Sequence, residues 1–169
     1  MTILLSTATS TIWQEAVKTA ESACLVTLDD RVESYLVSLL NRYVNRPDIV
    51  KQVFAKAYLE ALERQAMERS LSLQQVGDQC LLFAGLFPKQ AQRKHVKINY
   101  FVDVGRAAYN SISKNEFFSS LAMQFVLLMD ILQSIRGETD LLPLEAYEQW
   151  TELGSQRAFR ILQSYLNLP

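Results

Sequence analysis

The sequence predicts an all-α protein, a single compact bundle of about seven or eight helices with two apolar central helices. Apolar residues recur every three to four positions along almost the whole 169-residue chain, which is the helical period. The five glycines and four prolines are fewer than the many tight turns of a sandwich or barrel need. With 49% hydrophobic and 21% charged residues, the chain is expected to bury a core. No linker or repeat divides it, so we expect one helical domain over 1–169.

The N-terminal part of the chain predicts three amphipathic helices. The first covers about 11–24 and the second about 30–43, and both begin at residue pairs with the spacing of a capping box. The third begins at Pro47, a residue that suits a first helical turn, and continues to about Ala61.

The central part of the chain predicts two helices that are apolar on every side. One runs over about 72–87, where Ser72 and Gln75 form a capping box and Pro88 ends the helix, and the other runs over about 117–135. Helices of this kind are normally central to a bundle. A helix over about 98–112 lies between them in the chain.

Four signals mark the starts and ends of helices in the rest of the chain. Ser113 and Glu116 form a capping box before the second apolar helix, and Gly137 suits the cap at its end. A short helix is expected after Pro143, and the pair Gly154-Ser155 separates it from a last helix.

Net charge and cysteine usage exclude several classes of function. The formal net charge of −1 lacks the basic excess of nucleic-acid binders, so we expect no nucleic-acid partner. The longest apolar stretch, Leu121 to Leu132, is too short for a bilayer, so we expect no membrane insertion. The N-terminus has no secretory pattern, and Cys24 and Cys80 suit reduced thiols. These features favour a cytoplasmic protein.

No catalytic, metal or cofactor motif is present in the sequence. The single histidine, His95, is not part of a Glu-x-x-His motif, and the two cysteines lack zinc spacing. Neither a G-x-S-x-G elbow nor a glycine-rich phosphate loop occurs. We therefore expect no catalytic residue, metal or cofactor, and the sequence favours a non-enzyme over an enzyme.

Two aspartates on the apolar helices are the candidate functional residues. Asp78 lies on the helix over 72–87 and Asp130 on the helix over 117–135. An unpaired buried carboxylate is costly, so each is expected to have a partner or to be exposed. A structural polar network is one interpretation. The other is a ligand site of Asp78, Gly105, Tyr109 and Asp130.

A pattern in the central third of the chain resembles a family of uncharacterised bacterial all-helical proteins. Its residues are Gly77-Asp78, Leu82-Phe83-Ala84-Gly85-Leu86-Phe87-Pro88, Tyr100-Phe101, Gly105 and Ala108-Tyr109. The family pattern reads Gly-Asp, Leu-Phe, Gly-Phe-Phe-Pro, Tyr-Tyr, Gly and Ala-Tyr. Here Leu86 stands for an aromatic residue and Phe101 for a tyrosine. The resemblance implies a bacterial source and a helical fold, and no mechanism.

Three hypotheses about function follow from these observations, the third being an enzyme built on the pocket of the second. The first is a non-enzymatic interaction or regulatory module that acts through a helix face, with a protein partner or as a homo-oligomer. Its aromatic candidates are Trp13, Tyr147, Trp150 and Tyr165. The second is a bundle that binds a small apolar molecule or a lipid in a pocket between the central helices.

Overall fold

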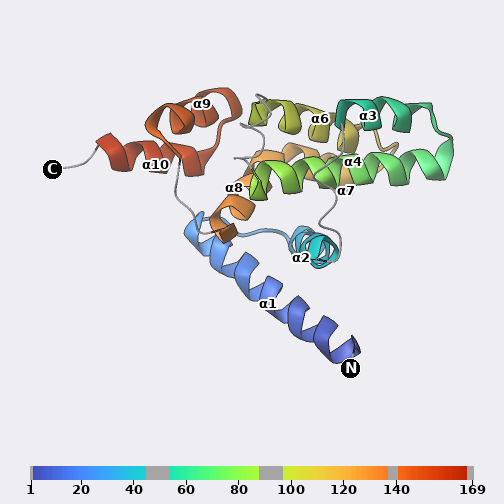
Figure 1. Cartoon of the computed structure of the whole chain (residues 1–169), viewed down its shortest axis with the longest axis horizontal. Helices are drawn as coiled ribbons and strands as arrows, with labels where there is room; N and C mark the ends of the chain where they lie inside the picture. The colour runs from blue at the N-terminus through green and yellow to red at the C-terminus, as the bar shows by residue number, and fades with distance from the viewer. Residues whose placement is uncertain (1, 45–53, 88–96, 137–140, 167–169) are drawn as a thin grey trace.

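The chain folds as a bundle of α-helices (Figure 1). The computed structural model describes residues 2–44, 54–87, 97–136 and 141–166, which hold nine helices and no strand. The helices are α1 (Thr2–Ala23), α2 (Asp30–Val44), α3 (Phe54–Glu63), α4 (Ala66–Leu86), α6 (Ile98–Asn110), α7 (Glu116–Met123), α8 (Phe125–Arg136), α9 (Pro143–Leu153) and α10 (Gln156–Leu166). The all-α prediction is confirmed, with one helix more than the expected seven or eight.

The additional helix arises because the helix predicted over 117–135 is broken at Gln124. This residue leaves helical geometry, with φ −93° and ψ 9°, and its side chain donates back to the Oγ of Ser120 at 2.8 Å. The chain bends by 63° between α7 and α8. None of the helices in the described ranges is long and apolar enough to span a membrane alone. Only α7 and α8 taken together across this bend have the required length and hydropathy.

The two helices predicted to be central contain many buried side chains. α4 packs against α3, α6 and α8, while α8 also contacts α1. The buried residues of α4 are Leu73, Val76, Gly77, Asp78, Cys80, Leu81, Leu82, Phe83, Ala84 and Gly85. Those of α8 are Phe125, Val126, Leu128, Met129, Asp130, Ile131, Leu132 and Gln133. Both aspartates singled out from the sequence therefore lie inside the protein.

Several predicted helix starts are wrong by a few residues or more. α4 begins at Ala66, so Ser72 lies inside the helix rather than at its start. The cap of α7 is Asn115 and not Ser113, because the Asn115 Oδ1 accepts from the backbone N–H of Phe117 at 3.0 Å. α1 begins near residue 2 rather than near 11. Residue pairs with the spacing of a capping box also occur inside a helix, because the helix propensity of the preceding residues can extend the helix beyond them.

The signals at the C-terminal end predicted the structure well. Pro143 stands in the first turn of α9, and Gly154 ends that helix in the left-handed conformation, with φ 74°. The predictions for Pro47, Pro88, His95 and Gly137 fall outside the described residues.

α9 and α10 form a helical hairpin at one end of the long axis of the molecule (Figure 1). The hairpin has a small hydrophobic cluster of its own, separate from the main core, formed by Leu141, Ala146 and Ala158 with Trp150, Ile161 and Leu162. Leu153 of α9 packs against the main core, and polar contacts also attach the hairpin to the bundle.

Candidate functional site

Asp78 lies at the centre of a polar cluster that joins α2, α4 and α6. Its Oδ1 accepts hydrogen bonds from the hydroxyl of Tyr35 at 2.5 Å and from that of Tyr109 at 2.7 Å. Its Oδ2 lies 3.4 Å from Nη2 of Arg42. The amide of Gln74 donates to the Tyr35 hydroxyl at 3.2 Å, so this hydroxyl both donates and accepts. A single buried carboxylate on α4 thus binds side chains from two other helices, α2 and α6.

Burial dominates the electrostatics of Asp78, whose residue surface is only 4% exposed. Loss of hydration raises the pKa of this carboxyl from 3.8 to about 6, although the hydroxyls of Tyr35 and Tyr109 and the charge of Arg42 act in the opposite direction. The same burial and the neighbouring carboxylate raise the pKa of Tyr109 well above its usual value. Both tyrosines are therefore donors near neutral pH, as an ionised Asp78 requires.

The absence of a side chain at Gly77 lets Tyr109 approach Asp78. A Cβ atom at Gly77 would lie 2.4 Å from Cε1 of Tyr109, which is closer than real atoms pack. Since Gly77 directly precedes Asp78 on α4, the glycine and the carboxylate together receive the ring and its hydroxyl. The Gly-Asp pair of the sequence pattern therefore has a structural explanation in this chain.

A hollow of about 80 Å³, which Asp78 lines in part, lies between α2 and α4. Arg42 and Asp78 provide its charged groups, and its remaining walls are Leu39, Tyr43, Gln75, Gln79 and Leu82. Arg42 was not singled out from the sequence, because its position on the solvated side of an amphipathic helix gives no signal.

Asp130 belongs to a second polar cluster, which attaches the α9–α10 hairpin to α8. The hydroxyl of Ser155 donates to Oδ1 of Asp130 at 2.6 Å, and the backbone N–H of Arg157 donates to the same carboxylate. Burial raises the pKa of Asp130 to about 6, while Ser155, Arg157 and Arg160 lower it in part. Because Ser155 Oγ also accepts from Ala158 N at 3.0 Å, it caps α10 as well.

Two arginines of α10 extend this attachment. Arg157 Nη1 donates to Oε1 of the buried Gln133 at 3.0 Å, and Arg160 Nη2 donates to the carbonyl of Cys24 at 2.8 Å. On the other side, Glu152 of α9 interacts with the side chain of Asn99 on α6. Hydrogen bonds thus add to the apolar contact of Leu153 where the hairpin meets the bundle.

The four residues of the predicted ligand site do not share one polar cluster. Asp78 and Tyr109 are hydrogen-bonded, as described above. At Gly105 a Cβ atom would lie 2.5 Å from Cε2 of Phe125, so α6 and α8 are in close contact there. Asp130 is bound by Ser155 and Arg157 instead. Ligand binding by these four residues stays a prediction.

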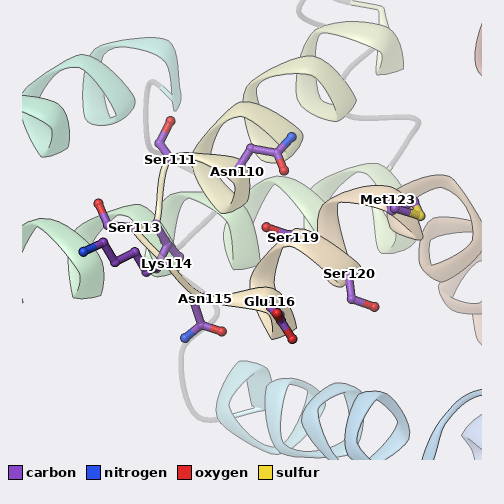
Figure 2. A pocket seen from close by; sticks show the side chains of 10 residues that line it. Asn110, Ser111, Ser113, Lys114, Asn115, Glu116, Ser119, Ser120 and Met123 are labelled. Carbon is purple, nitrogen blue, oxygen red and sulfur yellow. The ribbon is translucent and has the colours of Figure 1, made fainter.

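A larger hollow, of about 620 Å³, lies at the turn between α6 and α7 (Figure 2). Several of its polar side chains already serve local structure: Asn115 caps α7, and Ser111 contacts the hydroxyl of Tyr58 at 3.1 Å. Figure 2 shows Lys114 and Ser120 pointing in different directions rather than toward a common point. This surface lacks the convergent polar groups that define a specific ligand site.

The most exposed apolar surface of the hairpin lies at its open end, where α9 begins and α10 finishes. The hydroxyl of Tyr165 donates to the carbonyl of Leu141 at 2.9 Å, which fixes these two ends beside each other. We define the hairpin face as five exposed residues: Leu142, Leu144, Tyr147, Tyr165 and Leu166. Of these residues, the sequence indicates only the two tyrosines as interface candidates.

Comparisons of the chain with models of protein families, with curated proteins and with solved structures found no match. Within the described residues, no group of three or more histidine, cysteine, aspartate or glutamate side chains is placed to hold a metal ion. Cys24 and Cys80 are both buried and unpaired, and burial raises the pKa of each thiol. The family resemblance stays an expectation from the residues themselves.

Proposed function

We propose that this protein is a non-enzymatic interaction module that binds a protein partner through the hairpin face. The observation that supports the proposal most directly is exposure. Leu142, Leu144 and Leu166 are 62%, 68% and 75% exposed, and Tyr147 is 51% exposed. Exposed apolar patches of this kind mark interaction surfaces, and tyrosine is enriched in them.

The secondary structure also supports the proposal. Leu144 and Tyr147 are three residues apart on α9, so they lie on one side of the helix. The ring of Tyr147 contacts Trp150, and Trp150 contacts Phe159 on α10, with ring centroids 6.3 Å and 4.7 Å apart. Aromatic surface therefore continues from the exposed end of the hairpin across both helices.

Charge indicates the chemistry of the partner. α9 has neither lysine nor arginine; of its three glutamates, Glu145 accepts from the backbone N–H of Leu142 and Glu152 pairs with Lys97, which leaves Glu148. Glu148 directly follows Tyr147 and lies one turn beyond Leu144, so the apolar centre has an acidic border. A complementary surface has apolar residues in its centre and lysine or arginine around them, because electrostatic complementarity steers encounter and fixes register. The expected partner segment is a basic amphipathic helix.

A small apolar ligand or lipid between the central helices is the alternative function. The contacts of Gly77 with Tyr109 and of Gly105 with Phe125 fill those points of the helix interfaces with side chains. The packing there supports the interaction proposal over the alternative.

Photo-crosslinking tests the proposal directly. A photoreactive residue is placed at position 144 of the full chain, and a matched one at position 59, because Leu59 is a similarly exposed leucine on α3. We expect position 144, and not position 59, to crosslink a single partner through a segment rich in apolar and basic residues. Equal crosslinking from both positions would overturn the proposal. Crosslinking only to a second copy of this chain would overturn the proposed basic partner and indicate a homo-oligomer instead.

A further inference from the structure

We propose that the hollow between α2 and α4 binds a small zwitterion of the α-amino-acid class, whose ammonium group binds Asp78 and whose carboxylate binds Arg42. This site differs from the hairpin face, and it also lies outside the four-residue pocket expected from the sequence. Asp78 is common to both ligand sites, while Arg42 and the walls of the hollow are new.

The first observation is that the two oxygens of Asp78 are unequally satisfied. Oδ1 accepts from two tyrosine hydroxyls, at 2.5 Å and 2.7 Å. Oδ2 has Arg42 Nη2 at 3.4 Å, whereas charge-assisted N–H···O bonds are about 2.7–2.9 Å long. A carboxylate oxygen accepts two hydrogen bonds, so Oδ2 retains capacity for a further donor. An ammonium group is such a donor.

The second observation concerns Arg42, the only cation among the described residues that line this hollow. Its side chain is half exposed, and the guanidinium group carries five N–H donors in a planar fork that suits a carboxylate. In the described part of the chain, its contacts are the long one to Asp78 and a stacking contact over the ring of Tyr35, with 5.9 Å to the ring centroid. The guanidinium group therefore has donors left for a ligand carboxylate.

The third observation is the pairing of charges on one hollow. A ligand with only a negative charge would be repelled by Asp78, and a ligand with only a positive charge would be repelled by Arg42. Because the two protein groups lie 3.4 Å apart, a ligand with both charges close together matches them. An α-amino acid carries its ammonium and carboxylate groups on adjacent atoms.

The size and walls of the hollow limit the rest of the ligand. Its volume of about 80 Å³ limits the ligand to a small molecule. Leu39 and Leu82 provide apolar walls, which suit a hydrogen or a methyl group as the substituent. Glycine and alanine are thus suitable probes.

Nuclear magnetic resonance titration of the full chain tests this site. The probes are glycine, L-alanine, acetate and methylamine, each added alone at about pH 8, where Asp78 is ionised. We expect saturable shifts of the Arg42 side-chain resonances with the two amino acids. Acetate and methylamine, which each satisfy only one protein charge, are expected to bind at least about tenfold more weakly.

Two arginine variants locate the site. Arg42→Gln is expected to weaken glycine binding at least about tenfold, because it removes the charged donor. Arg31→Gln is the matched control, since Arg31 is also on α2 but lies over the ring of Phe117 and does not line the hollow. The site is overturned if the wild-type chain shows no saturable shift, or if both variants bind glycine equally. Acetate or methylamine binding as tightly as glycine would overturn the ligand class.

Discussion

The hydrogen bond from Tyr109 to Asp78 makes a prediction about stability that depends on pH. Tyr109→Phe removes one hydroxyl and leaves the ring that packs against Gly77. Above the raised Asp78 pKa of about 6 the carboxylate is ionised, and a hydrogen bond to a charged group contributes about 1.5–3 kcal/mol. Below that pKa the carboxyl is neutral, and the same bond contributes about 1 kcal/mol. The loss is therefore expected to be larger at about pH 8 than at about pH 5.

Urea unfolding of the wild-type and Tyr109→Phe chains at these two pH values measures the difference. Tyr58→Phe is the matched control, because the Tyr58 hydroxyl contacts a neutral group, the hydroxyl of Ser111, at 3.1 Å. Its loss should be about 0.5–1.5 kcal/mol and the same at both pH values. The reasoning is refuted if Tyr109→Phe shows no pH dependence or costs no more than Tyr58→Phe at the higher pH.

Three further predictions follow from the buried groups. Lowering the pH from about 7 to about 5 should raise the free energy of unfolding by about 2–3 kcal/mol, because Asp78 and Asp130 have a higher pKa in the folded chain than in the unfolded chain. Urea unfolding at the two pH values measures this change, and a decrease in stability at the lower pH would contradict the prediction. Gly105→Ala should cost about 1–3 kcal/mol through overlap with Phe125, and less in a Phe125→Leu background, as a double-mutant cycle would measure. Ser155→Ala removes both the donor to Asp130 and the cap of α10, so amide hydrogen exchange in α9 and α10 should accelerate. The control variant Ser164→Ala, at an exposed serine of α10, should leave the exchange rates unchanged.

The helical fold was predictable because helical periodicity is a local property. The two apolar helices expected from the sequence correspond to α4 and to α7 with α8, and the turn residues Pro143 and Gly154 have the expected roles. The break at Gln124 was not predicted. It depends on a side chain that bonds back to Ser120 within an otherwise continuous apolar pattern.

The candidate sites were less predictable, because their residues come from separate helices. The sequence placed Asp78 and Tyr109 in one candidate ligand site, and a carboxylate on an apolar helix was expected to have a partner. The partners Arg42 and Tyr35 are ordinary residues of an amphipathic helix, and their selection depends on how α2 packs against α4. Likewise, the exposure of Leu144 depends on tertiary packing, because the same residue would be buried if another helix packed against that side of α9.

The affinity of the crosslinked partner segment for variants of the hairpin face tests the central claim most directly. The segment is synthesised as a peptide and titrated into the full chain by calorimetry. Leu144→Glu is predicted to weaken binding about 10-fold or more, because it places a charge in the apolar centre, whereas Leu59→Glu leaves binding unchanged. Equal affinities for the two variants would contradict the assignment of the hairpin face as the interaction surface.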